Sequence, residues 1–261
     1  MTGLEMRNLA WITCDFYSET LKLSTGIEVF IPQAALMPYG SSSKLPVLYL
    51  LHGRGADQTE WMRRSSIERY AENKGIALVM PGVGRSYYMD MANGLPYFTF
   101  LSEELPELVP SFFPVSGRRE DTFVAGISMG GYGAFKLAMS YPDRYAAGAS
   151  LSGGLDLASR AAGPGFQEQE IRTLFGRVDR LRGSRDDLLF LATEFAAYTG
   201  DKPMLYQCCG TEDFLYNDNQ TFRRYADSLG LHITYEEEPG GHEWGYWDRK
   251  IQRVLDWLPL P

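Results

Sequence analysis

Uninterrupted runs of hydrophobic residues recur along the chain in a way that is typical of a buried parallel sheet. A short run without polar alternation indicates a strand covered on both faces. Such runs, the fourth weaker than the rest, predict strands at Leu45–Leu51, Ile76–Met80, Thr122–Ala125, Tyr145–Leu151 and Met204–Cys209. Ile233–Glu237 alternates hydrophobic with polar residues and predicts an edge strand. Two earlier strands, Ala10–Tyr17 and Ile27–Ile31, are expected to pair antiparallel through a turn near Gly26.

Helical periodicity fills most of the intervals between these runs. It predicts helices over 101–112, with Ser102 as the N-cap, and over 130–140, 215–229 and 244–258. Alternation of strands and helices predicts an α/β fold with a mostly parallel sheet, helices on both faces and its chemistry at the carboxyl ends of the strands.

One long segment, Leu155–Asp201, breaks this alternation. It contains Gly163-Pro164-Gly165 and a charged stretch but no clear strand, and it exceeds the length of a simple connection. We interpret it as a partly helical insertion over the strand ends, or as a lid.

Composition narrows the class of protein. With 261 residues, 44% hydrophobic and 22% charged, the chain suits one large domain spanning 1–261. A net charge of -8 argues against nucleic acid or an anionic membrane as partner. Cys14, Cys208 and Cys209 suggest no disulfide framework, and neither a signal peptide nor a membrane span is evident. A cytoplasmic protein is therefore expected.

The strongest local signal for chemistry is GISMG at 126–130, a G-x-S-x-G motif between a predicted strand and a predicted helix. This pattern is typical of a sharp turn that holds a nucleophilic serine, here Ser128, in strained backbone geometry. The glycines leave room for neighbouring backbone. The N–H of Met129 faces the same point, where the helix dipole favours negative charge. The alternative is a glycine-rich turn with an incidental serine.

A second loop, His52-Gly53-Arg54-Gly55, follows the first buried strand. In sheets of this kind the loop supplies another N–H for an oxyanion, and we assign that donor to the backbone of Arg54. His52 is either a general base or a residue that fixes the loop by hydrogen bonds. The second interpretation is favoured because this fold brings in its base last along the chain.

An acid and a histidine follow the last two strands. Asp213 stands where a carboxylate can orient an imidazole, and Glu212 is the solvated alternative. His242 lies in a glycine-flanked loop and is the predicted base, whereas His232 begins an edge strand at the wrong end of the sheet. The chain order of Ser128, acid and histidine is that of α/β-hydrolases. No metal-ligand spacing, P-loop or dinucleotide fingerprint occurs, so no metal or cofactor is expected.

At these residues the sequence resembles the esterase D group of α/β-hydrolases. That group includes S-formylglutathione hydrolases, feruloyl and acetyl-xylan esterases of carbohydrate esterase family one, and bacterial tributyrin esterases, which are most similar. The matching stretches, spread over most of the chain, are PVLYLLHGRG (46–55), the Trp61 region, EELPELVPSFFP (103–114), FVAGISMGGYGAFKLA (123–138), CGTEDFLY (209–216) and GGHEWGYW (240–247).

The resemblance implies an α/β-hydrolase fold and serine hydrolysis of short-chain acyl esters, such as tributyrin and p-nitrophenyl acetate or butyrate, through an acyl-enzyme. It implies Ser128, Asp213 and His242 as a triad, with Arg54 and Met129 as backbone oxyanion donors. A small-molecule ester is the expected partner, and homo-oligomers are frequent among such proteins. Feruloyl or acetyl-xylan esterase, S-formylglutathione hydrolase and acyltransferase activities stay open, as does a non-catalytic binding protein on the same fold.

Aromatic and glycine residues after the strand ends are candidates for the substrate pocket. These are Gly53, Trp61, Tyr87, Tyr88 and Trp244. Ordinary packing of the aromatic residues is an equally good interpretation. Arg85 either meets an acidic alcohol group of a substrate or is a solvated charge.

Overall fold

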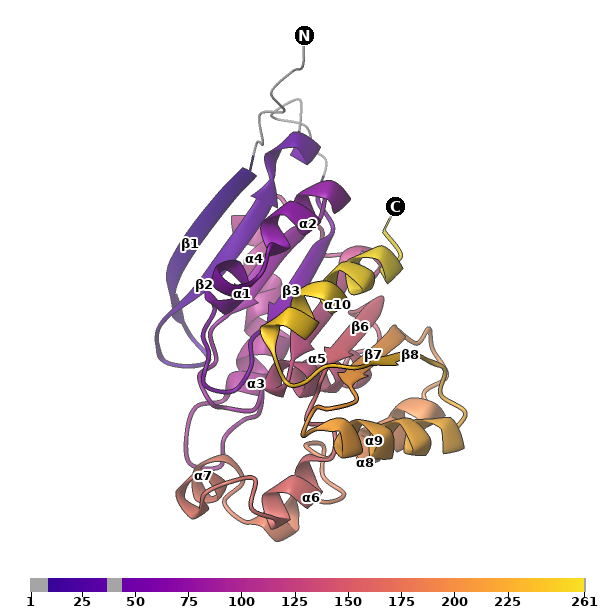
Figure 1. The fold of residues 1–261 in the computed structure, drawn as a ribbon. Helices are drawn as coiled ribbons and strands as arrows, with labels where there is room; N and C mark the ends of the chain where they lie inside the picture. The colour runs from indigo at the N-terminus through magenta and orange to yellow at the C-terminus, as the bar shows by residue number, and fades with distance from the viewer. Residues whose placement is uncertain (1–8, 37–43, 261) are drawn as a thin grey trace.

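The computed structural model describes residues 9–36 and 44–260. At its centre is an eight-stranded sheet in the order β1-β2-β4-β3-β5-β6-β7-β8 (Figure 1). The strands are β1 (Leu9–Ser18), β2 (Leu23–Pro32), β3 (Val47–Leu51), β4 (Ala77–Pro81), β5 (Thr122–Ile127), β6 (Ala147–Leu151), β7 (Met204–Gly210) and β8 (Ile233–Glu238). β2 pairs antiparallel with β1 and β4, and all pairs from β4 to β8 are parallel. The predicted α/β fold is confirmed, with every expected strand present and β8 at the edge.

The turn between β1 and β2 is not where the sequence pattern placed it. Gly26 lies inside β2 opposite Asp15, and the chain reverses earlier, between the end of β1 at Ser18 and the start of β2. The Glu104 carboxylate accepts hydrogen bonds from the N–H groups of Glu19 (2.7 Å) and Thr20 (3.0 Å). This turn is stabilised by a side chain far away in the sequence, so local turn residues do not reveal it.

Helices cover both faces of the sheet. Successive side chains of a strand point to opposite faces, so Leu48 and Leu50 of β3 belong to one core and Val47 and Tyr49 to the other. The helices of the first core are α1 (Glu60–Arg64), α2 (Ile67–Lys74) and α10 (Trp244–Trp257). Those of the second are α4 (Leu105–Phe112), α5 (Met129–Ser140), α8 (Leu188–Ala197) and α9 (Tyr216–Ser228). None of the helices in the described ranges is long and apolar enough to span a bilayer.

The helical stretch that leads into α4 begins before the predicted N-cap. It runs through α3 (Tyr97–Thr99) and a π-helical turn, η2 (Phe100–Glu104), so that Ser102 is a buried residue inside it. Asp90 caps this stretch instead, accepting hydrogen bonds from the N–H (2.9 Å) and the hydroxyl (2.7 Å) of Thr99. Short 3-10 turns complete this half of the chain at η1 (Gln33–Leu36) and η3 (Arg119–Asp121).

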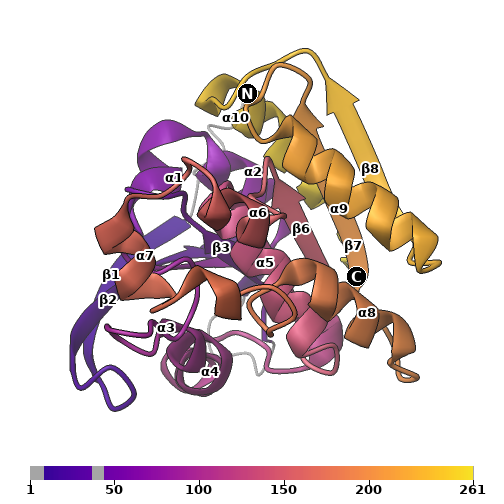
Figure 2. The same ribbon diagram turned by 90° about the horizontal axis from the view of Figure 1, so that it is seen from below.

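The segment Leu155–Asp201 divides into two parts. Its first part contains α6 (Leu157–Ala162), α7 (Glu168–Leu174) and the turn η4 (Val178–Arg180). Figures 1 and 2 show α6 and α7 beyond the carboxyl ends of the strands. The second part, α8, packs on the sheet face beside α5 and α9, and so completes the crossover from β6 to β7. The layer over the strand ends is therefore shorter than the segment predicted from sequence.

Candidate functional site

Three predicted residues meet at the carboxyl edge of the sheet. The Nε2 atom of His242 lies 2.9 Å from the Ser128 hydroxyl oxygen. Its Nδ1 atom lies 2.9 and 3.1 Å from the two carboxylate oxygens of Asp213. The carboxylate is fully buried, and the imidazole is 18% exposed. This hydrogen-bonded chain can move a proton from the serine hydroxyl to the imidazole and stabilise the cation that results.

Ser128 occupies the strained position that its motif predicts. It joins β5 to α5 with φ 55° and ψ -116°, a region that non-glycine residues rarely adopt. The flanking glycines make the turn fit. A methyl group on Gly126 would overlap the Gly130 carbonyl and lie 2.8 Å from the Leu51 Cβ atom. One on Gly130 would overlap the Leu51 carbonyl and lie 2.8 Å from the His52 carbonyl oxygen.

We expect Gly130→Ala to lower the free energy of unfolding by about 2 kcal/mol or more, because the added methyl group overlaps backbone at the end of β3. Denaturant unfolding checks this result. Gly245→Ala is the control: in α10 a Cβ atom at this position meets nothing within 4 Å, and alanine favours a helix. Equal destabilisation by both changes would contradict the steric account.

Asp213 and His242 are held by the loops that follow β7 and β8. Backbone hydrogen bonds from Thr211 to Glu238 (3.0 Å) and from Glu212 to Gly240 (3.1 Å) join the two loops. The Leu215 N–H donates to the Asp213 carboxylate at 2.8 Å. Adjacent Glu212 is exposed and turned outward, so the structure brings only one of the two candidate acids to the imidazole. Phe214 and Trp247 pack against the imidazole, with ring centres at 4.5 and 4.8 Å.

Two backbone N–H groups beside Ser128 are available to an acceptor. Met129 is the first residue of α5, where helix geometry leaves N–H groups without an internal partner. The Arg54 N–H forms no hydrogen bond within the described residues. The loop that carries it lies against the turn, since a Cβ atom on Gly53 would be 3.7 Å from the Ser128 Cβ. Such donors can stabilise negative charge that develops on a bound carbonyl oxygen.

His52 sits behind this loop and is fully buried. Its Nε2 atom accepts a hydrogen bond from the Val83 N–H at 3.1 Å, and its Nδ1 atom then donates to the Gly53 carbonyl at 2.8 Å. The Tyr88 hydroxyl donates to the His52 carbonyl at 2.9 Å. Burial lowers the pKa of His52, which keeps the ring neutral. These contacts match the loop-fixing interpretation and use both ring nitrogens.

A cavity of about 350 Å³ opens above the hydrogen-bonded chain. Its lining residues are Arg54, Arg85, Tyr87, Ser128, Met129, Gly154, Arg160, Phe214, Leu215 and His242. Among the predicted pocket residues, Tyr87 reaches the wall, and burial raises the pKa of its hydroxyl.

The other predicted pocket residues are not among those that line this cavity. Trp61 is 1% exposed and donates to the Leu51 carbonyl at 3.1 Å, while its ring packs edge-on against Trp244. Tyr88 is fully buried, and Gly53 is a buried residue of the loop itself. Their positions correct the sequence-based expectation. Trp61 and Tyr88 pack into the core and Trp244 is half-buried against Trp61, whereas Tyr87 lines the cavity. Position after a strand end does not by itself distinguish these cases.

Sequence reasoning missed Arg160 and Phe214 as cavity residues. Phe214 could have been predicted, because it directly follows Asp213 and a residue next to a catalytic acid lies close to the site. Arg160 comes from α6, in the segment without a clear pattern, and no local signal marks it. In the described ranges, no group of three or more His, Cys, Asp or Glu side chains is arranged to hold a metal ion.

Comparisons with known proteins show what this chain is similar to. The family model described as "Putative esterase" matches residues 18–258. An acetyl esterase of Caldicellulosiruptor saccharolyticus is 30% identical over 261 residues, covering 96% of this chain and 98% of that protein.

Two solved structures from Staphylococcus aureus are also similar. The substrate-bound fluorophosphonate-binding serine hydrolase F is 33% identical, with a TM-score of 0.89 over 96% of this chain and 98% of that one. The S-formylglutathione hydrolase FrmB is 32% identical, with a TM-score of 0.87 over 96% and 99% of the two chains.

Proposed function

Since this chain belongs to the esterase family whose model spans residues 18–258, and is therefore a carboxylic ester hydrolase, we propose that it hydrolyses short-chain acyl esters with Ser128 as its nucleophile. The observation that carries the proposal is the hydrogen-bonded chain from Ser128 through His242 to Asp213. The strained turn beneath the serine supports the same role.

The proposed reaction proceeds in two halves. Ser128 attacks the ester carbonyl while His242 Nε2 accepts the hydroxyl proton, and the buried Asp213 carboxylate stabilises the imidazolium that forms. The carbonyl oxygen, now negative, accepts hydrogen bonds from the Arg54 and Met129 N–H groups. The alcohol leaves with the proton from His242. Water then attacks the acyl-enzyme by the same route and releases the acid and the free serine.

The preference for short acyl chains is supported by the size of the cavity. About 350 Å³ is near the lower end of the range for small-molecule sites. Tyr87, which is mostly buried, forms part of the cavity wall, and a small cavity of this kind favours short acyl chains. The similar protein from Caldicellulosiruptor saccharolyticus is named an acetyl esterase.

Acyl chain length tests the proposal. We expect kcat/KM for p-nitrophenyl esters to be highest between acetate and butyrate and to fall by about tenfold or more at decanoate, since a chain that does not fit loses its apolar contacts. The measurement is initial rates across the even-numbered acyl series. A rate that rises steadily to decanoate would contradict a short-chain site. Methyl ferulate, acetylated xylan and S-formylglutathione belong in the same panel, because a higher kcat/KM for any of them would replace the simple ester as substrate class.

A further inference from the structure

The side chain of Arg160 faces the same cavity as Ser128 and His242 and forms no hydrogen bond within the described residues. The side chain is only 18% exposed, and its Nε atom is buried without an acceptor. The nearest acid, Asp218 of α9, lies 3.6 Å from Nε, which is an ion pair but too long for a hydrogen bond. The Asp218 Oδ2 atom is likewise buried without a hydrogen-bond partner, so it and the Arg160 Nε atom face each other. The two Nη groups of Arg160 form no hydrogen bond within the described residues, and they are the donors that a ligand in the cavity can use.

The wall of the cavity is cationic. Arg54 and Arg85 also line it, and both donate to the single carboxylate of Glu170, which is not among the lining residues. Arg54 additionally donates to the Gly165 carbonyl at 3.1 Å, so its guanidinium is committed to holding the layer over the strand ends. No carboxylate side chain is among the lining residues in the described part of the chain. Burial raises the pKa of Asp218, the counter-ion of Arg160, to about 6. Asp218 is therefore protonated more readily than an exposed aspartate.

The position of Arg160 points to one side of the substrate. Its guanidinium lies 5.5 Å from the centre of the Phe214 ring, and that ring lies 4.5 Å from the imidazole of His242. In the proposed reaction the leaving alcohol takes its proton from His242 Nε2 and therefore lies beside this imidazole. An alcohol group that extends over Phe214 would reach Arg160.

We propose that this enzyme prefers esters whose alcohol part carries a carboxylate, and that Arg160 binds that carboxylate. The inference rests on the proposed function, because the alcohol side is defined by attack from Ser128. A guanidinium offers two parallel donors that match a carboxylate, and a mostly buried site strengthens each of those bonds.

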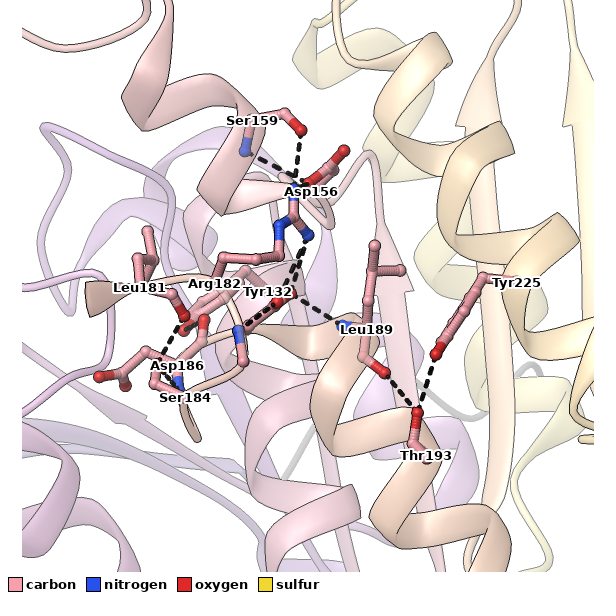
Figure 3. A network of polar contacts seen from close by, with 12 residues as sticks. Tyr132, Asp156, Ser159, Leu181, Arg182, Ser184, Asp186, Leu189, Thr193 and Tyr225 are labelled. Atoms are coloured by element: carbon pink, nitrogen blue, oxygen red, sulfur yellow. Dashed lines mark hydrogen bonds and ion pairs between the residues drawn. The ribbon is translucent and has the colours of Figure 1, made fainter. Parts of the chain in front are cut away.

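The helix that carries Arg160 is fixed in place before substrate binds. Figure 3 shows Arg182 donating to the Asp156 carboxylate and to the Ser159 hydroxyl, both at 2.9 Å, at the start of α6. The Tyr132 hydroxyl of α5 donates to the Asp186 carbonyl at 2.8 Å. These contacts connect the layer over the strand ends to the helix that begins next to Ser128. The cation is thereby held ready, which lowers the entropic cost of binding.

The test compares 4-(butyryloxy)benzoate with its neutral methyl ester, which differ in charge only on the alcohol side. We expect Arg160→Gln to lower the ratio of kcat/KM for the charged over the neutral ester by about 10- to 100-fold, the range for a hydrogen bond to a charged group. Arg160→Lys keeps the charge without the two-pronged donor and should give an intermediate ratio. Arg177→Gln is the control, because Arg177 is 66% exposed and pairs with Asp179. It should leave the ratio as in the wild type.

A second pair places the charge on the acyl side: the mono-p-nitrophenyl ester of glutaric acid and p-nitrophenyl valerate. If Arg160→Gln lowers the ratio for this pair instead, the assignment to the alcohol side is overturned. An unchanged alcohol-side ratio in a folded Arg160→Gln protein, or in Arg160→Lys if the glutamine variant does not fold, overturns the inference alone. Wild-type protein that hydrolyses none of the four esters overturns the proposed function and this inference with it.

Discussion

Ser128→Ala is expected to lower kcat for p-nitrophenyl butyrate by about 10⁴- to 10⁶-fold, the range seen when a serine nucleophile is removed from a triad. Alanine lacks the hydroxyl that His242 Nε2 contacts at 2.9 Å, so no acyl-enzyme can form. What remains is hydrolysis by water, aided by the two N–H groups beside the turn. The turn itself should persist, because the strained backbone is enforced by its neighbours rather than by the hydroxyl.

Two measurements separate chemistry from folding in this experiment. Reaction with a fluorophosphonate probe should label the wild-type chain and not the Ser128→Ala chain, while the unfolding midpoint stays close to the wild-type value. Ser111→Ala is the matched control, since Ser111 is exposed and its hydroxyl donates to the Leu108 carbonyl at 2.7 Å, within its own helix. Label retained by the Ser128→Ala chain would show that another residue is the nucleophile.

Asp213→Asn is expected to lower kcat by about 10⁴-fold. A carboxamide turned with its NH₂ group toward His242 donates to Nδ1 and drives the ring proton to Nε2. The Nε2 atom can then no longer accept the proton of Ser128. The change also removes the buried negative charge that stabilises the imidazolium, and it leaves shape and volume almost unaltered.

Glu212→Gln provides the comparison for this change. It removes the same charge one residue earlier, from an exposed side chain whose backbone N–H bonds to Gly240. We expect kcat within about twofold of the wild type, as for most exposed substitutions. A similar loss of kcat in both variants would contradict this role of Asp213. It would mean that catalysis depends on the overall charge of the loop and not on orientation of the imidazole by one carboxylate.

Much of the architecture follows from local patterns. The unalternated runs at β3 and β4 identify buried strands, and the alternation in β8 identifies an edge strand, because side chains of a strand point to opposite faces in turn. Parallel strands place their carboxyl ends at one edge, so residues that follow different strands come together. This is why Ser128, Asp213 and His242 could be grouped from the sequence although they are far apart along it.

Other features depend on contacts between distant segments and leave no local trace. The turn after β1 is stabilised by Glu104, and the helical stretch before α4 is capped by Asp90. The predicted position of the turn and the predicted start of the helix were therefore wrong, whereas the predicted end of the helix at Phe112 is confirmed. Trp61 and Tyr88 follow strand ends as pocket residues do, yet packing against α10 and the His52 loop buries them.

The sequence alone was enough to predict that a serine, an acid and a histidine lie at one edge of a parallel sheet. The order of hydrophobic runs and glycine-flanked motifs predicts this arrangement, because the strands, the helices between them and the turns leave local patterns. Which residues line the cavity, by contrast, depends on the tertiary structure. Arg160 reaches the site because α6 is fixed over the strand ends by Arg182 and its partners, and such long-range packing is not encoded in the residues next to Arg160.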